Sequence, residues 1–233
     1  MGHSAMKPFH PMLGELLTDG ASGLSYRVLE PLSPQPSKCL ILLHGVGGNE
    51  TNLMDIAAGL DRDTLVVFAR GPLQMGAQQF AWFRVAFTAS GPRIVPEEAE
   101  RSRTTLIAFV QQLQARHGIN AANTVIAGFS QGGILSASVA LTAPESLAGF
   151  AVLSGRILPE LEPHLASQQR LSNLKAFIGH GTQDSKLPVD WAHRSDALLN
   201  GLGVDHQLRL YPMDHGISAA MHADFLKWRA ALG

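Results

Sequence analysis

Cysteine is nearly absent from this sequence. The 233 residues contain a single one, Cys39, so no disulfide can form within the chain and the fold does not depend on an oxidising compartment. No apolar run approaches the roughly 18 residues that a membrane span needs. The first residues, MGHSAMKPFHPM, lack the apolar core of a secretion signal. We therefore expect a soluble, cytoplasmic protein, and we interpret residues 1–6 as a cloning remnant.

Charge and metal-binding patterns are sparse as well. Charged residues make up 16% of the chain and the net charge is −1, which argues against a nucleic-acid partner. The 10 histidines show neither an H-E-x-x-H pattern nor the spacing of a zinc finger. The nucleotide-binding loops G-x-x-x-x-G-K-S/T and G-x-G-x-x-G are absent. The sequence thus predicts a protein that uses no metal and no cofactor.

Apolar residues, by contrast, form 45% of the chain, enough for a large core. Short runs such as Leu40–Leu43, which Cys39 enters as a small hydrophobe, suit strands buried within a parallel sheet. They alternate with segments of helical period, which indicates a mostly parallel, doubly wound α/β sheet with helices on both faces. No break divides residues 1–233, so we expect one domain. The expected strands are residues 24–29 (an edge), 40–43, 65–68, 125–127, 150–153, 176–178 and 206–211; the expected helices are 51–60 (capped by Thr51), 96–117, 134–143, 190–202 and 217–232.

A serine between glycines stands where one of these strands turns into a helix. The stretch Gly128–Gly132, GFSQG, fits G-x-S-x-G, the nucleophile elbow. The tight turn brings the residues two before and two after the serine together, where a Cβ would clash. The alternative is an ordinary glycine-rich turn, but the flanking strand and helix favour the elbow. We therefore predict that Ser130 is a nucleophile, with the N-terminal end of the next helix directed at the site.

A serine hydroxyl needs a histidine to take its proton and an acid to orient that histidine. Elbow proteins carry these groups in the order Ser, Asp or Glu, His. His215 follows the last strand and precedes the last helix, at the strand end that also carries Ser130. Asp184 follows the strand at 176–178, and Asp214 is its rival. Because sequence neighbours rarely orient one another's side chains, we predict Asp184 as the acid.

Attack on an acyl carbon creates an oxyanion that needs aimed hydrogen-bond donors. One is the backbone N–H of Gln131, the residue after the nucleophile. The other should come from the loop after an early strand, and the glycines of HGVGGN at 44–49 allow that loop to turn inwards. We predict Val46 N–H as the second donor. A glycine-rich turn without chemistry is the alternative.

With these segments placed, the chain resembles the phospholipase/carboxylesterase family of α/β-hydrolases. The matching stretches cover most of the chain in the family's order: LLHGVGGNE at 42–50, AWF at 81–83, GFSQGG at 128–133, GHGTQD at 179–184 and MDHGI at 213–217. The resemblance implies the same triad and oxyanion donors, and hydrolysis of carboxylic esters or thioesters without a cofactor. Family members often carry an aspartate after Trp-Phe, where this chain has Arg84.

The substrate pocket is less well defined by the sequence. We assign Trp82, Phe83 and Val189 to its wall, although aromatic residues at 82 and 83 suit the core equally well. Residues 156–173 form a short excursion where a larger lid could stand. The leucines of that segment either line an acyl site or, as we favour, belong to the core: Leu158, Leu161 and Leu165.

The predicted function is a serine hydrolase that cleaves short- to medium-chain carboxylic esters, or thioesters, through an acyl-enzyme. A lysophospholipase or acyl-protein thioesterase, a peptidase and a depolymerase are alternatives on the same fold. A third hypothesis is a binding protein of this fold whose triad has decayed, which the presence of Ser130, Asp184 and His215 opposes. The expected partner is a small-molecule ester, and the expected oligomeric state is a monomer or a homodimer.

Overall fold

The computed structural model describes residues 11–30 and 33–233. The interpretation of residues 1–6 as a cloning remnant therefore lies outside the described residues, as does part of the loop before the first buried strand.

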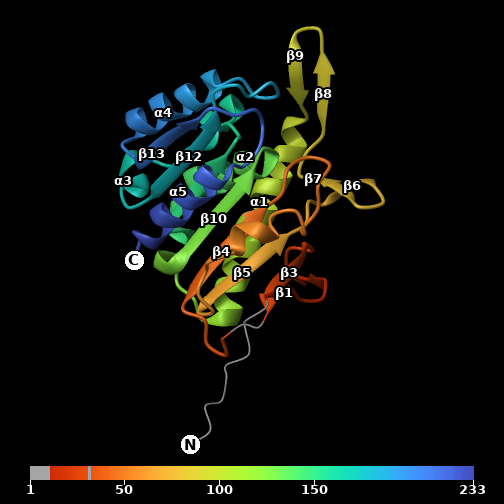
Figure 1. Cartoon of the computed structure of the whole chain (residues 1–233), viewed down its shortest axis with the longest axis vertical. Coiled ribbons are helices and arrows are strands. Elements are labelled where there is room, and N and C mark those ends of the chain that lie inside the picture. Colours follow the sequence, from red (N-terminus) through yellow and green to blue (C-terminus); the bar gives the residue numbers. More distant parts are fainter. Residues whose placement is uncertain (1–10, 31–32) are drawn as a thin grey trace, which may run out of the picture.

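A central sheet organises the described part of the chain (Figure 1). Its strand order is β1-β3-β5-β4-β10-β11-β12-β13, with β2 beside β3. The strands from β5 to β13 in that order run parallel, whereas β1, β2 and β3 pair antiparallel. This confirms the predicted, mostly parallel sheet. The strands are β1 (Met12–Leu13), β2 (Leu17–Thr18), β3 (Ser25–Glu30), β4 (Lys38–Leu43), β5 (Thr64–Ala69), β10 (Thr124–Phe129), β11 (Gly149–Leu153), β12 (Lys175–Gly181) and β13 (Asp205–Tyr211).

Helices cover both faces of the sheet because its strands are apolar on both sides. In β4, Ile41 belongs to one core and Leu40 to the other, and both are fully buried. The first core includes residues of α1, α2 and α4, and the second includes residues of α5. Cys39 is buried in the first core, and burial raises the pKa of its thiol to about 12, so it stays protonated. The helices are α1 (Pro96–His117), α2 (Gln131–Thr142), α3 (Gln168–Leu171), α4 (Asp190–Leu202) and α5 (Ala219–Ala230).

Two of the predicted helices end where the sequence places their stops. Gly118 and Gly203 follow α1 and α4 with φ of 66° and 71°, the left-handed conformation that glycine adopts without strain. The predicted helix at 51–60 is wrong. Only a 3-10 turn forms there, and Thr51 instead binds the side chain of Asn49. The turn ends at Ala58, whose backbone is already extended with φ −61° and ψ 128°. The 3-10 turns are η1 (Met54–Ala57), η2 (Ala121–Asn123), η3 (Pro144–Ser146) and η4 (Pro159–His164).

Two antiparallel hairpins between β5 and α1 were not predicted. They are formed by β6 (Leu73–Gly76) with β7 (Gln79–Ala81), and by β8 (Val85–Thr88) with β9 (Gly91–Ile94). Figure 1 shows the β8–β9 hairpin projecting beyond the carboxyl ends of the parallel strands. That edge of the sheet is where an α/β fold usually carries its site.

The predicted edge strand and the predicted short excursion are both present, with differences of detail. β3 lies one position inside the edge, because β1 pairs with its far side through two residues. Residues 156–173 contain only η4 and α3. Leu158 and Leu161 are buried in the first core and Leu165 packs against it, as the core interpretation predicted.

Candidate active site

The turn between β10 and α2 places Ser130 at the carboxyl end of the sheet. Its backbone adopts φ 53° and ψ −115°, a left-handed conformation that costs a non-glycine residue about 1–3 kcal/mol. A Cβ at Gly128 would lie 2.2 Å from the carbonyl carbon of Gly132, and one at Gly132 would lie 2.0 Å from the carbonyl oxygen of Leu43. Both positions therefore require glycine, which is the steric reason for the predicted elbow.

Three side chains from three different loops meet at this turn. The Ser130 hydroxyl lies 3.0 Å from His215 Nε2, within hydrogen-bond reach. His215 Nδ1 lies 2.7 Å from Asp184 Oδ2. The phenyl ring of Phe129 flanks the imidazole, with the ring centroids 5.0 Å apart. Nucleophile, base and acid candidates thus form one connected line, in the geometry expected of an activated serine.

The structure separates the two candidate acids. The Asp184 side chain is fully buried, and its Oδ1 accepts the backbone N–H groups of Lys186 at 2.9 Å and Leu187 at 2.8 Å. Its other oxygen, Oδ2, is thereby aimed at His215. Asp214 Oδ1 accepts hydrogen bonds from the backbone N–H of His215 and from Ser185, so it shapes the loop rather than the imidazole. The two aspartates therefore occupy different positions, and of the two it is Asp184 that contacts the imidazole of His215.

Two buried residues that the sequence analysis did not single out hold the acid and base loops. His180, fully buried, donates from Nε2 to the carbonyl oxygen of Leu187 at 2.8 Å, and the same nitrogen lies 3.4 Å from Asp184 Oδ2. Ser154, also fully buried, donates its hydroxyl to the carbonyl of Gly216 at 2.6 Å. Ser154 directly follows β11 and His180 is the next-to-last residue of β12, so the sequence signal that could have found them is their position at the carboxyl ends of two predicted strands.

The glycine-rich loop after β4 lies against the serine. A Cβ at Gly45 would lie 3.4 Å from the Cβ of Ser130. His44, buried at the loop's start, binds the Gly45 carbonyl through Nδ1 and accepts the N–H of Gly71 at Nε2. This pattern requires a neutral imidazole, and burial accordingly lowers the pKa of His44. Val46, half exposed, follows next and lines the same cavity as Ser130.

The side chain of Gln131 ties the start of α2 to the segment that follows β7. Its Oε1 accepts the N–H of Trp82 at 2.7 Å, and its Nε2 donates to the carbonyl of Phe83 at 2.7 Å. The Trp82 indole N–H in turn binds the carbonyl of His44 at 2.9 Å. Gln131, Trp82 and the loop after β4 are thereby fixed relative to one another, which orients the backbone around both predicted oxyanion donors.

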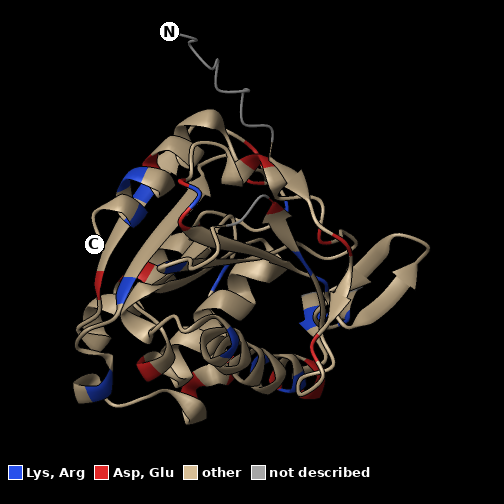
Figure 2. Cartoon of the chain, turned by 90° about the horizontal axis from the view of Figure 1, so that it is seen from below, with Lys and Arg blue, Asp and Glu red and all other residues tan. Residues whose placement is uncertain are grey.

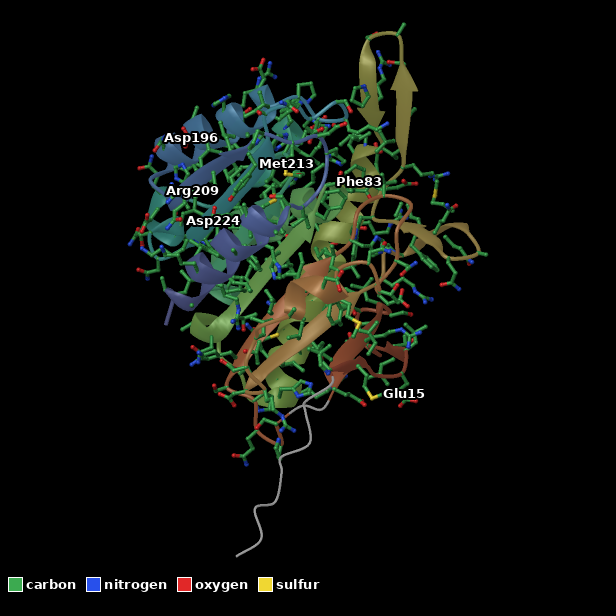
Figure 3. All side chains as sticks on the ribbon, in the orientation of Figure 1. Glu15, Phe83, Asp196, Arg209, Met213 and Asp224 are labelled. Atoms are coloured by element: carbon green, nitrogen blue, oxygen red, sulfur yellow. The ribbon has the colours of Figure 1, made fainter. Side chains whose placement is uncertain are left out.

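A cavity of about 350 Å³ opens beside Ser130. Phe83 belongs to its wall and, in Figure 3, lies near the base of the β8–β9 hairpin. The structure does not bring the other two predicted wall residues to the cavity. Trp82 is fully buried behind it, and Val189 packs against the first core. The remaining apolar wall comes mainly from the hairpin, α2 and the loop after β12: Val85, Ile94, Ile134 and Leu187.

Arg84, the departure from the family pattern, faces away from the reaction. Its guanidinium and backbone N–H both bind the buried carboxylate of Glu98 on α1, with Nε 2.7 Å from Oε1. Hydrogen bonds from Arg84 lower the pKa of Glu98. The pair anchors the base of the β8–β9 hairpin to α1, and Arg84 does not line the cavity.

A buried ion-pair network fixes the end of the loop after β4. The Glu50 side chain is about 1% exposed and binds Arg70 at 2.7 Å and Arg27 at 3.1 Å. Burial by itself would raise the pKa of Glu50, but hydrogen bonds from Arg70, from its own backbone N–H and from Arg27 outweigh it and lower the pKa to about 2. The carboxylate is therefore ionised at neutral pH.

Replacing Glu50 with glutamine is expected to lower the free energy of unfolding by about 3 kcal/mol or more, because two partly buried guanidinium groups lose their carboxylate. The folded pKa of Glu50 lies below its ordinary value of 4.5, so this stabilisation is complete above about pH 4.5 and is lost as the pH falls towards 2. Urea unfolding of both proteins across that range measures it. Glu145→Gln is the control, since its pair with Arg170 is exposed to solvent and its loss should change the free energy of unfolding far less. Equal losses in the two variants would contradict the buried network.

Within residues 11–30 and 33–233, no group of three or more His, Cys, Asp or Glu side chains could hold a metal ion. None of the helices described there combines the length and the apolar character that crossing a bilayer requires. Acidic and basic residues are interspersed along the ribbon in Figure 2.

Comparison with known proteins places this chain in a family. A model of the Phospholipase/Carboxylesterase family matches residues 25–229. Acyl-protein thioesterase 1 of Kluyveromyces lactis is 32% identical over 176 residues, which cover 70% of this chain and 76% of that protein. The putative hydrolase MhqD of Bacillus subtilis is 29% identical over 185 residues, covering 78% of this chain and 81% of that protein. A solved carboxylesterase from Mesorhizobium loti shares the fold, with a TM-score of 0.77 at 24% identity over 92% of this chain and 98% of that chain.

Proposed function

The chain belongs to the phospholipase/carboxylesterase family of α/β-hydrolases, a family of ester hydrolases, and from this premise we propose that it cleaves carboxylic esters through a triad of Ser130, His215 and Asp184. The observation that carries the proposal is the connected pair of contacts, 3.0 Å from Ser130 Oγ to His215 Nε2 and 2.7 Å from His215 Nδ1 to Asp184 Oδ2.

In the first step, Ser130 Oγ attacks the ester carbonyl carbon while His215 Nε2 takes the hydroxyl proton. The carboxylate of Asp184 accepts the Nδ1–H bond and stabilises the imidazolium that forms. The tetrahedral oxyanion is held by the backbone N–H groups of Val46 and Gln131, aided by the N-terminal end of α2. These two roles are supported by the Gly45 loop lying against Ser130 and by the Gln131 side-chain ties.

In the second step, the C–O bond to the alcohol breaks and His215 gives its proton to the leaving oxygen, which leaves an acyl group on Ser130. A water molecule then attacks the acyl carbon, His215 takes its proton, and the acid is released with the serine restored. For a thioester the leaving atom is sulfur, and His215 takes and gives protons in the same steps. No electrons are transferred, so the sequence of steps needs no redox partner.

The cavity supports short- to medium-chain acyl esters. Its volume of about 350 Å³ is at the lower end of the range for small-molecule pockets, about 300–1,000 Å³. The similar proteins are named for thioesters and for carboxylic esters, so acyl thioesters are a second substrate class, with lysophospholipids as a further alternative. A non-catalytic role is opposed by the contact between Ser130 and His215.

A substrate panel tests this function. We expect 4-nitrophenyl esters of graded chain length to be hydrolysed, with kcat/KM highest for short to medium chains and falling for long ones that exceed the cavity. Acyl-coenzyme A thioesters and lysophospholipids run in parallel rank the alternative substrates. Absence of turnover of every ester and thioester by folded protein would contradict the proposal.

Three further expectations from the sequence accompany the function. We infer a single domain, which is supported by one family model spanning residues 25–229. A monomer or homodimer is the expected assembly, to be measured by size-exclusion chromatography with light scattering. A cytoplasmic location is the third, and it rests on the sequence alone.

A further inference from the structure

A buried arginine lies in the wall of the candidate active site without a catalytic role. Arg156 lines the same cavity as Ser130 and His215, and only 8% of it is exposed. It follows β11, whose last residue, Leu153, accepts the backbone N–H of Ser130 at 2.9 Å. A Cβ at Gly155 would lie 2.8 Å from the Ser130 carbonyl oxygen. The chain therefore delivers Arg156 to the cavity from directly beside the nucleophile.

The charge of Arg156 has no counter-ion in the described part of the chain. Within residues 11–30 and 33–233, no carboxylate lies within ion-pair distance of its guanidinium, and none of its nitrogens makes a hydrogen bond there. Arginine stays charged when buried, and buried charges are normally paired. Burial lowers the pKa of Arg156, while the field of the exposed Glu160 acts in the opposite direction. Within the described residues the N–H donors of Arg156 have no acceptor, which leaves them available to an anion in the cavity.

An aromatic ring positions this guanidinium. It lies 4.4 Å from the centre of the Trp191 ring on α4, and Arg194 lies 4.8 Å from the same ring. The cation–π contact stabilises the orientation of Arg156 but satisfies none of its N–H donors. Those donors remain available to a planar, bidentate acceptor such as a carboxylate or a phosphate group.

The other charged side chains of the cavity wall also favour an anionic ligand. Lys186 lies in the wall too, exposed and without an ion pair within the described residues. Among the described lining residues there is no aspartate or glutamate, so Arg156 and Lys186 are its charged side chains, with His215 as the titratable one. Apolar walls around cations focus their field on the cavity, which favours an anionic ligand.

We propose that the ester hydrolysed at Ser130 carries a second, anionic group, a carboxylate or a phosphate, which Arg156 binds while Lys186 attracts it at the cavity mouth. The proposal rests on the proposed function and specifies its substrate class. Arg156 is then a specificity-determining residue, since it touches substrate remote from the scissile bond. The alternative is that Arg156 serves only to cover Trp191.

Matched substrate pairs measure the preference. Mono-4-nitrophenyl adipate and 4-nitrophenyl hexanoate have acyl chains of equal carbon number and differ by one carboxylate. Hexanoyl-glycerol 3-phosphate and monohexanoylglycerol differ by one phosphate. Rates are corrected for spontaneous hydrolysis. We expect the anionic member of one pair to have a kcat/KM at least about tenfold higher, and Arg156→Met to lower that ratio about 10- to 100-fold, the worth of a charge-assisted hydrogen bond.

Two further variants control the test. Arg194→Met removes the second guanidinium that contacts the Trp191 ring. Because Arg194 does not line the active-site cavity, this variant should keep the wild-type ratio of kcat/KM between anionic and neutral esters. Arg156→Lys keeps the charge and should retain part of the preference, and turnover of the neutral esters verifies that each variant is folded.

The outcomes separate the two proposals. A preference in the adipate pair identifies a carboxylate, and one in the glycerol pair identifies a phosphate; either supports the inference if Arg156→Met abolishes it. Neutral esters cleaved as well as both anionic ones, or a preference that survives Arg156→Met, would overturn the inference and leave the esterase function intact. Failure to cleave any ester would instead overturn the proposed function.

Discussion

Replacing Ser130 with alanine is expected to lower kcat for ester hydrolysis by about 10⁴-fold or more. The substitution removes the hydroxyl oxygen that lies 3.0 Å from His215 Nε2, so no acyl-enzyme can form at this position. The oxyanion donors and the cavity remain, and they leave a small residual rate over water. Steady-state hydrolysis of a short-chain 4-nitrophenyl ester by purified wild-type and variant protein gives the comparison.

Ser136→Ala is the matched control for this measurement. Ser136 is buried on the same helix, α2, and its hydroxyl donates to the carbonyl of Gly132 at 2.9 Å, away from His215. Its loss should leave kcat within a small factor of wild type. If the Ser130→Ala protein hydrolyses the ester at a near-normal rate, Ser130 is not the nucleophile and the proposed mechanism is contradicted, regardless of the result for Ser136→Ala.

Replacing Asp184 with asparagine is expected to lower kcat by about 10⁴-fold while the fold is kept. The reason lies in how the carboxylate is held. Oδ1 accepts two backbone N–H groups, from Lys186 and Leu187, so the asparagine oxygen must take that place. Its NH₂ group then faces His215 Nδ1 as a donor and forces the proton to Nε2. The imidazole would present an N–H to Ser130, and it could no longer accept the hydroxyl proton.

The pair of variants at 184 and 214 makes this test specific. Asp214→Asn keeps an oxygen for the N–H groups of Ser185 and His215, and we expect kcat within about tenfold of wild type. Both variants are compared by kcat and by circular dichroism, which shows whether they are folded. A larger loss from Asp214→Asn than from Asp184→Asn would mean that the acid has been assigned wrongly.

The positions that meet at the site could be predicted because each has a local signature. Ser130 stands in a glycine-flanked turn between a strand and a helix, and His215 follows the last strand. Asp184 could be preferred to Asp214 as the acid because Asp214 is next to His215 in the sequence, and the side chains of adjacent residues rarely face one another. Buried parallel strands such as β4 are continuous apolar runs, so their approximate positions along the chain could be predicted too, whereas their order in the sheet was not.

Other features were not predictable, because they depend on contacts between segments far apart in the chain. The β8–β9 hairpin has strands of four residues each, which are too short to show the apolar alternation that marks a half-buried strand. The helical period at 51–60 matched the burial of Leu53, Ile56 and Ala57, but the backbone forms only the short turn η1 there and becomes extended at Ala58. Arg156 belongs to no motif, and the lack of a carboxylate beside it, within the described residues, is visible only in space.

The account depends most on Ser130 becoming nucleophilic through His215, and covalent labelling tests that directly. Folded protein is treated with a fluorophosphonate, digested, and the modified peptide is sequenced by mass spectrometry. The triad predicts stoichiometric modification at Ser130, and much slower modification of the same residue in Asp184→Asn. A label on a different residue, or no label on folded protein, would contradict it.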